Sequence, residues 1–141
     1  MIDTSEVSDV IIRYSRLEAT SSDATECSLS AISSSAAQLQ FRNEIVNSRI
    51  SITTKQGDAF GIFGGNQDYL ISNSQISLNA KNGQALILQG KSVTLAGEPS
   101  SFSVQSGESN PKLWRVEHFL NESTPPSQCI VNDNEAQDCK L

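Results

Sequence analysis

The chain has 141 residues, of which 37% are hydrophobic and 6% aromatic, and its formal net charge at pH 7 is −6. A chain of this length is expected to form one domain around one core. The acidic balance argues against nucleic-acid binding, which needs clustered Lys and Arg, and no apolar run approaches the roughly 20 residues that cross a bilayer as a helix.

The first ten residues, MIDTSEVSDV, carry acidic side chains where a signal peptide would have a basic end and an apolar stretch. Two interpretations stay open at this point. Either the protein stays inside the cell, or the chain is a piece of a longer exported protein whose signal peptide is not present in it. In both cases we expect residues 1–9 to cap the first end of the fold.

One weak copy of a repeat lies in the first third of the chain, and an insertion separates its two expected strands. Residues 14–20 (YSRLEAT) are similar to residues 47–53 (NSRISIT), and residues 38–43 are expected to form the second strand of that first unit. Residues 21–37 lie between the two strands and contain Cys27. We expect this insertion to project outward as a flap or an extra strand.

The clearest copies of the repeat lie in the middle of the chain. Residues 45–64 align with residues 71–90 without a gap, and nine of the twenty positions are identical, where chance would give about one or two. Each copy alternates apolar and polar residues, turns at a glycine and then alternates again, which predicts strand, turn, strand. The expected inward residues are Ile50, Ile52, Phe60 and Ile62 in the first copy and Ile76, Leu78, Leu86 and Leu88 in the second.

A fourth unit is expected downstream, with its strands at residues 91–97 and 102–104. The first-strand markers are 33, 26 and 17 residues apart, at Leu17, Ile50, Ile76 and Val93. Unequal spacing is typical of stacked repeats that keep their strands and vary their loops. The coils are therefore predicted to occupy residues 10–105.

Identity between consecutive units favours a parallel solenoid, because equivalent residues of successive coils then lie directly above each other. Asn47 above Asn73 would form a hydrogen-bonded amide ladder, and Ser48 above Ser74 would extend it. An antiparallel β-sandwich is the alternative, since it also has short strands and Gly or Asn turns. We predict an all-β fold, a right-handed parallel β-helix of about four coils.

The segments ISNSQISLNAKNGQALIL and IVNSRISITTKQGDAFGIFG resemble coils of the right-handed parallel β-helix superfamily. That superfamily includes pectate-lyase-like enzymes, phage tailspikes and the passenger or polymorphic outer-membrane repeats of bacterial surface proteins. The repeats are most similar to the surface-protein type. The resemblance covers residues 10–105 and implies a fold more strongly than a function, because this fold hosts lyases, hydrolases and structural stalks alike.

Residues 106–141 are expected to form a C-terminal cap and tail, which makes residues 1–141 a single domain. Pro111 is a suitable first residue for a helix, yet residues 113–119 also alternate as a strand does, and both interpretations stay open. Trp114 is expected to be a packing residue of this cap.

Cys129 and Cys139 lie close together in the polar tail and are predicted to form a disulfide, with two free thiols as the alternative. The pairing of Cys27 is left open. A disulfide indicates an oxidising compartment. Together with the resemblance to bacterial surface proteins, it predicts a secreted or cell-surface location.

The sequence predicts no catalytic, metal or cofactor site. Residues 85–92 (ALILQGKS) fit a loose phosphate-loop pattern, but strand-forming residues stand where the loop and helix should be. The one histidine, His118, has no serine elbow to act with, and residues 132–138 lack calcium-loop spacing. The expected outward columns contain no paired carboxylates for polysaccharide cleavage, and Asp58 and Asp68 are placed in turns.

One outward column, formed by Arg16, Arg49 and Gln75, is the surface we select as a candidate binding site for a glycan or protein partner. The sequence thus predicts a non-catalytic structural or adhesive module of an exported bacterial protein. The alternative is a fragment or diverged member of a carbohydrate-active β-helix enzyme, either a polysaccharide lyase or a hydrolase.

Overall fold

The computed structural model describes residues 2–4, 11–21, 29–34 and 42–141, and these residues form strands and no helix. Three sheets run along the molecule. The first contains β1 (Ile2–Thr4), β4 (Leu29–Ser34), β7 (Ala59–Phe63), β10 (Ala85–Gln89) and β13 (Trp114–Arg115). The second contains β2 (Ile11–Arg13), β5 (Arg42–Val46), β8 (Asp68–Ser72), β11 (Ser92–Leu95) and β14 (His118–Asn121). The third contains β3 (Arg16–Thr20), β6 (Arg49–Thr54), β9 (Gln75–Ala80), β12 (Ser101–Ser106), β15 (Gln128–Val131) and β16 (Gln137–Asp138).

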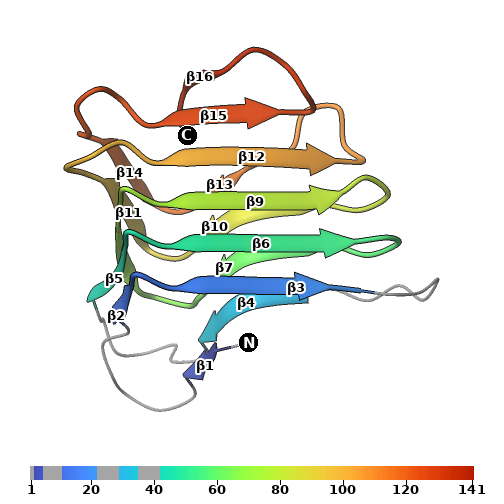
Figure 1. Ribbon diagram of the computed structural model, residues 1–141, viewed down its shortest axis with the longest axis horizontal. Helices are drawn as coiled ribbons and strands as arrows, with labels where there is room; N and C mark the ends of the chain where they lie inside the picture. The colour runs from blue at the N-terminus through green and yellow to red at the C-terminus, as the bar shows by residue number, and fades with distance from the viewer. Residues whose placement is uncertain (1, 5–10, 22–28, 35–41) are drawn as a thin grey trace.

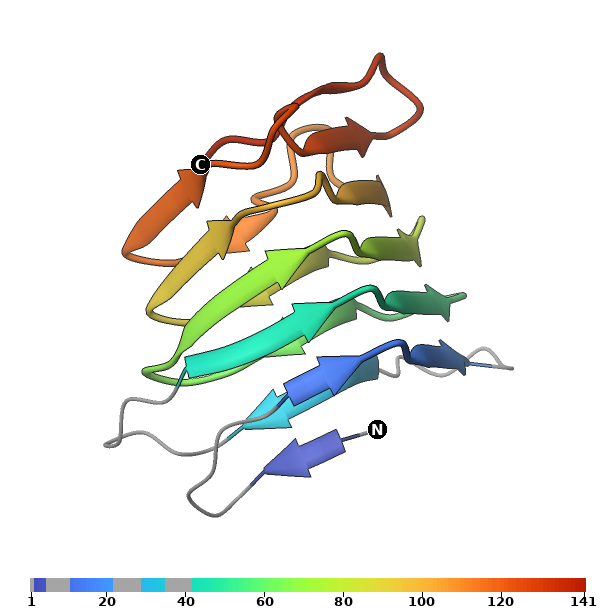
Figure 2. The ribbon, with the colours of Figure 1, turned by 60° about the vertical axis from the view of Figure 1, so that its left-hand side comes forward.

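The chain visits the second, third and first sheets in turn, and each strand pairs with the strand of the same sheet in the preceding coil. Figure 1 shows β3, β6, β9, β12 and β15 stacked in this way, and in Figure 2 the two ends of the chain lie at opposite ends of the stack. Neighbouring strands are parallel throughout, except that β16 runs antiparallel to β15. The fold is a parallel β-helix, as predicted, and the sandwich alternative was wrong. No helix in the described residues is long and apolar enough to cross a membrane.

The register confirms the alignment of the two clearest repeats. Ile50 lies opposite Ile76 in neighbouring strands, and the other aligned pairs of these strands follow the same register. The amide ladder is present as well, because Asn73 Nδ2 donates a hydrogen bond to Asn47 Oδ1 over 2.7 Å. Identical residues therefore lie above one another along the axis of the solenoid.

Each coil contains three strands, whereas the sequence predicted two. The predicted fourth unit was consequently wrong, because Val93 pairs with Tyr69 in the second sheet and Phe102 is the residue that lies opposite Ile76. The strands of the second sheet are short, and β11 places only Val93 and Leu95 in the core. Two inward residues match the start of a strand in any of the three sheets. For this reason β11 was assigned to the same column as Ile50 and Ile76, in the third sheet, although it belongs to the second.

The first coil also differs from the prediction. The strand that stacks on β7 is β4, within the segment predicted as an insertion. Residues 38–43 were expected in that role, but residues 35–41 lie outside the described residues and Arg42–Val46 is β5, which belongs to the next coil. The sequence of β4, LSAISS, is rich in serine and so does not show the alternation of apolar and polar residues that predicts a strand, although Ile32 is buried. Cys27 lies outside the described residues.

The parallel stack continues past residue 105, through residues predicted to be cap and tail. Strands β13, β14 and β15 pair in parallel with β10, β11 and β12. The segment for which helix and strand were both open therefore forms strands, and β16 then turns back along β15. A disulfide joins Cys129 in β15 to Cys139, the residue after β16.

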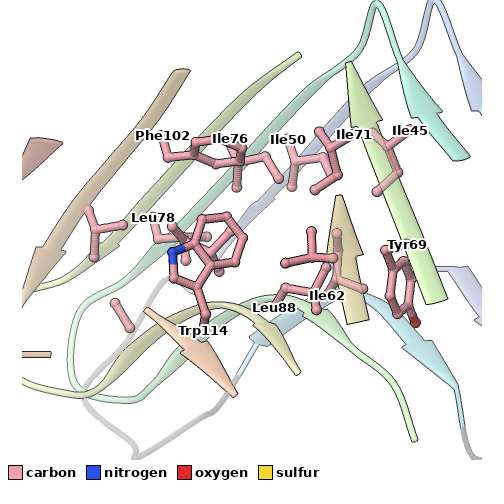
Figure 3. Packing of buried hydrophobic residues seen from close by; sticks show 14 of the residues in the cluster. Ile45, Ile50, Ile62, Tyr69, Ile71, Ile76, Leu78, Leu88, Phe102 and Trp114 are labelled. Carbon is pink, nitrogen blue, oxygen red and sulfur yellow. The ribbon is translucent and has the colours of Figure 1, made fainter. Parts of the chain in front are cut away.

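Inward side chains fill the space between the three sheets in columns, with isoleucine and leucine predominating (Figure 3). Larger rings gather near the C-terminal end, where the Trp114 ring lies 5.1 Å from that of Phe102 and 5.0 Å from that of Phe119. Trp114 is 2% exposed, which confirms that it is a packing residue.

Strand β10 departs from the simple alternation that was predicted for it. Ala85, Ile87 and Leu88 belong to the core cluster, whereas Leu86 is buried outside it. The N–H groups of Ile87 and Leu88 both donate to the Leu113 carbonyl, over 2.8 and 3.4 Å. Two consecutive donors on one acceptor are typical of a β-bulge, which shifts the inward face by one residue.

Candidate functional site

The corner between the second and third sheets repeats from coil to coil. Between β2 and β3, β5 and β6, and β8 and β9 it is a two-residue connection whose first residue has positive φ: 52° at Tyr14, 50° at Asn47 and 43° at Asn73. The next two connections, residues 96–100 and 122–127, are longer. Asparagine is among the residues that tolerate this left-handed conformation best, because its short side chain can hydrogen-bond locally. The corner therefore turns the chain sharply and leaves the first side chain on the outside.

The last residue of each corner, immediately before the strand of the third sheet, is a serine, and four of these serines form a buried ladder. The N–H of Ser48 donates to Ser74 Oγ over 3.1 Å, the N–H of Ser74 donates to Ser100 Oγ over 3.0 Å, and the N–H of Ser100 donates to Ser127 Oγ over 2.9 Å. At the N-terminal end of the ladder, the N–H of Ser15 donates to Ser48 Oγ over 3.2 Å. Every coil thus fixes the corner of the coil before it.

Only Ser48 and Ser74 of this ladder were predicted from the sequence. Ser74 and Ser100 are separated by 26 residues, the same spacing as the first pair, and Ser127 follows after 27. The fixed spacing of 26 residues therefore predicts Ser100 as well, and a spacing of 26 or 27 predicts Ser127. The prediction of two strands in each repeat concealed this regularity.

Outside the serine ladder lies an open groove of about 530 Å³. Its walls come from the same corner in four successive coils and from the first residues of the strands that follow. The lining residues are Tyr14, Ser15, Arg16, Asn47, Ser48, Arg49, Asn73, Ser74, Gln75, Pro99 and Ser101. We call this feature the corner groove.

The three residues selected from the sequence lie together in the corner groove. Arg16 is opposite Arg49, and Arg49 is opposite Gln75. Arg49 Nε donates to Gln75 Oε1 over 3.0 Å, whereas Arg16 pairs with the Glu18 carboxylate in its own strand over 2.5 Å. All three side chains are exposed. Arg49 makes no ion pair with another described residue, so its guanidinium tip is available to a ligand.

Tyr14 was not selected from the sequence. Its side chain is 82% exposed at the first corner of the groove, in the position that Asn47 and Asn73 occupy in the next two coils. The alignment of residues 14–20 with residues 47–53 contained the signal, because it places an aromatic ring where the other copies have an amide. A large exposed ring at a fixed corner is a ready surface for stacking.

The carboxylates considered as catalytic candidates lie elsewhere and are engaged in structural contacts. Asp58 Oδ1 accepts the N–H of Gln84 over 2.8 Å, and Asp68 Oδ1 accepts the hydroxyl of Ser92 over 2.5 Å. Asp68 is the first residue of β8 rather than a turn residue. His118 is exposed at the start of β14. None of these three side chains lines the corner groove.

The remaining motifs are also accounted for by strands. The stretch that fits a loose phosphate loop contains β10 and the start of β11, so it does not lead into a helix. Over the part of the chain that the structure describes, no three His, Cys, Asp or Glu side chains cluster closely enough to hold a metal ion.

The fold and the corner groove together define the class of this protein as a parallel β-solenoid with a polar groove along one corner. Comparisons with protein-family models, with curated proteins and with solved structures found no significant match.

Proposed function

We propose that the protein is a non-catalytic structural or adhesive module of an exported bacterial protein and that it binds a glycan in the corner groove. The observation that carries the proposal is the groove itself. It places Arg16, Arg49 and Gln75 in one exposed column beside the ring of Tyr14.

The chemistry of the corner groove suits a hydroxyl-rich ligand. Guanidinium and amide groups offer planar pairs of donors, and an aromatic ring packs against the apolar face of a sugar. Equivalent positions repeat at about 4.8 Å along the solenoid axis, the usual spacing of neighbouring strands. A ligand with regularly repeated groups, such as a linear glycan, matches this repetition better than a compact one.

Rigidity also favours binding. The serine ladder fixes the backbone at each corner, and the amide ladder between Asn47 and Asn73 fixes two side chains. A site held in position before the ligand arrives loses less conformational entropy on binding. The repeated corner would therefore present its polar groups at constant spacing.

Export is supported by two features. The disulfide between Cys129 and Cys139 suits an oxidising compartment, and the coil sequences resemble those of bacterial surface proteins in the right-handed parallel β-helix superfamily. Membership of that superfamily is part of the proposal.

The alternative of a polysaccharide-cleaving enzyme has less support from the corner groove. Cleavage by a paired acid and base needs two carboxyl groups beside the scissile bond. The residues that line the groove include no Asp or Glu. For this reason we propose binding rather than turnover.

A glycan array with the purified protein tests the proposal. Arg49→Ala is expected to weaken binding to the selected glycan about tenfold, since it removes hydrogen bonds from a charged donor. Arg115→Ala is the matched control, because Arg115 is also exposed but lies in the first sheet, outside the corner groove. Absence of any bound glycan, or equal losses in the two variants, would refute the proposal. Polysaccharide turnover that Asp58→Asn or Asp68→Asn abolishes would instead establish the enzyme alternative.

A further inference from the structure

The corner groove carries positive charge although the whole chain is acidic. The formal net charge at pH 7 is −6, but the described residues that line the groove include both Arg16 and Arg49 and no Asp or Glu. Local charge decides which ligands a surface attracts, because exposed charges more than about 10 Å apart are largely screened by salt. The groove therefore favours a ligand with an anionic group.

The two arginines of the groove have different neighbours in their own strands. Arg16 lies two residues before Glu18, and its Nε and Nη2 both donate to Glu18 Oε1, over 2.8 and 2.5 Å. Arg49 lies two residues before Ser51, which is opposite Glu18 in the neighbouring strand. Residues two apart in a strand are on the same face of the sheet. The carboxylate that pairs with the arginine in the first coil is thus replaced by a short, uncharged serine in the second.

Gln75 orients the guanidinium of Arg49 from the next coil. Arg49 Nε donates to Gln75 Oε1 over 3.0 Å, which uses only one of the guanidinium donors. The two Nη atoms make no ion pair with a described residue. A planar guanidinium binds a carboxylate through two parallel hydrogen bonds. Arg49 is therefore oriented to receive a carboxylate from a ligand.

On the basis of the proposed function, we propose further that the corner groove binds a linear glycan in which a uronic acid alternates with a neutral sugar. One carboxylate of the glycan accepts hydrogen bonds from the Nη atoms of Arg49. It lies relative to Arg49 as the Glu18 carboxylate lies relative to Arg16.

Alternation is expected because of Glu18. Neighbouring coils are about 4.8 Å apart, which is close to the length of one sugar unit in a linear glycan. If every unit carried a carboxylate, one of them would lie beside Glu18, and like charges at this distance repel. A neutral unit at that position avoids the repulsion and packs its apolar face on the exposed ring of Tyr14.

Titration calorimetry with three linear hexasaccharides tests the proposal. The first alternates glucuronic acid with N-acetylglucosamine, the second is the first after reduction of its carboxyl groups to alcohols, and the third contains glucuronic acid alone. We expect the reduced glycan to bind about tenfold more weakly than the first, because it lacks the charged hydrogen bonds to Arg49. The third is expected to bind about threefold more weakly than the first, because Glu18 repels it.

The outcomes for the glycan class differ from those for glycan binding itself. Equal affinity for the first two hexasaccharides would overturn the uronic acid and leave the proposal of glycan binding intact. Failure of all three to bind would also overturn it, and the glycan array then decides the proposed function separately. Tighter binding of a hexaglutamate peptide than of the first glycan would show that the groove binds an acidic peptide instead.

A pair of charged variants tests the position of the carboxylate. Ser51→Glu places a carboxylate beside Arg49, as Glu18 stands beside Arg16, and is expected to weaken binding of the alternating glycan about tenfold. Ser103→Glu is the matched control, because it adds the same charge to the same outward column, two strands from Ser51 and with Ser101 in place of an arginine. Equal losses in the two variants would show general repulsion and refute a carboxylate site at Arg49.

Glu18→Gln tests the expected preference for alternation. This change removes the repelling charge, so it should raise the affinity for the uniform glucuronic acid glycan about threefold and leave that for the reduced glycan unchanged. Unchanged affinity for the uniform glycan would show that Glu18 does not select against it, and the proposed alternation would be wrong.

Discussion

At the scale of single residues, the two clearest copies of the repeat share glycines that leave room for a neighbouring ring, as well as identical side chains. Tyr69 points into the core from β8 and is 3% exposed, with its hydroxyl donating to Gln67 Oε1 over 3.2 Å. A Cβ atom at Gly64 would lie 2.1 Å from the Tyr69 oxygen, and one at Gly90 would lie 2.9 Å from a ring carbon of Tyr69. These two glycines are identical in the aligned copies because a side chain at either position would collide with this ring.

Burial raises the pKa of Tyr69 to about 12, whereas an unfolded tyrosine titrates near 10. The folded state therefore favours the neutral phenol. Its contribution to stability is complete below about pH 10 and is lost as the pH rises toward about 12, which amounts to about 2–3 kcal/mol. Urea unfolding below pH 10 and near pH 12 should show this loss in the natural chain and a smaller one in Tyr69→Phe. The control is Tyr14→Phe, in which an exposed phenol is changed; the prediction is wrong if both variants behave as the natural chain does.

At the scale of the structural element, the serine at the end of each corner recurs from coil to coil. Ser48 and Ser74 accept an N–H from the coil before, and each hydroxyl also donates over 2.8 Å to a carbonyl two residues earlier, that of Val46 or Ser72. One side chain thus satisfies two backbone groups that the turn would otherwise leave buried and unpaired. The same pair of hydrogen bonds is therefore present at Ser48 and at Ser74.

Ser74→Ala should be costly for this reason. It removes the acceptor of the buried Ser48 N–H, and an unpaired buried donor costs about 1–3 kcal/mol of unfolding free energy. Denaturant unfolding of Ser74→Ala and of Ser77→Ala measures the effect, with Ser77 as the control because it is an exposed serine on the adjacent strand β9. Equal stability of the two variants would contradict a structural role for the ladder.

The sequence was sufficient to predict the parallel stacking, because stacking depends on equivalent residues. Ile50 opposite Ile76 and Asn47 opposite Asn73 follow directly from the alignment. The number of strands in a coil was predicted wrongly, since β8 and β11 each place two side chains in the core, too few to show a separate period. The column of Arg16, Arg49 and Gln75 could be predicted because it depends only on the register within the third sheet.

The alignment of residues 14–20 with residues 47–53 contained the signal for the exposed ring of Tyr14, because it places a tyrosine where the other copies have asparagine. The return of the chain at the C-terminal end of the stack could not be predicted in this way, since β16 runs back along β15 instead of adding another parallel strand. A periodic pattern describes the interior of a stack, so it contains little information about its two ends.

At the scale of the whole molecule, the strands that the structure describes pair with equivalent strands of the coil before and the coil after. Stability in such a fold is a sum of nearest-neighbour interfaces, and the terminal coil has one neighbour instead of two. The C-terminal end is therefore expected to open first unless something closes it. Here the disulfide between Cys129 and Cys139 fixes β16 and the tail against β15.

Removal of the bridge by Cys129→Ala with Cys139→Ala should destabilise the end of the solenoid more than its middle. The bridge closes a loop between residues separated by 10 positions, and a loop of that size is worth about 2–3 kcal/mol in the chain-entropy description. Hydrogen exchange should accelerate strongly in β14 and β15 and weakly in β6 and β9, because opening begins at the end and the inner coils keep both neighbours. Cys27→Ala is the control, since it removes a cysteine without touching this bridge. If exchange accelerates equally in all four strands, the solenoid unfolds as one cooperative unit, and its coils are not the independent steps that nearest-neighbour stacking requires.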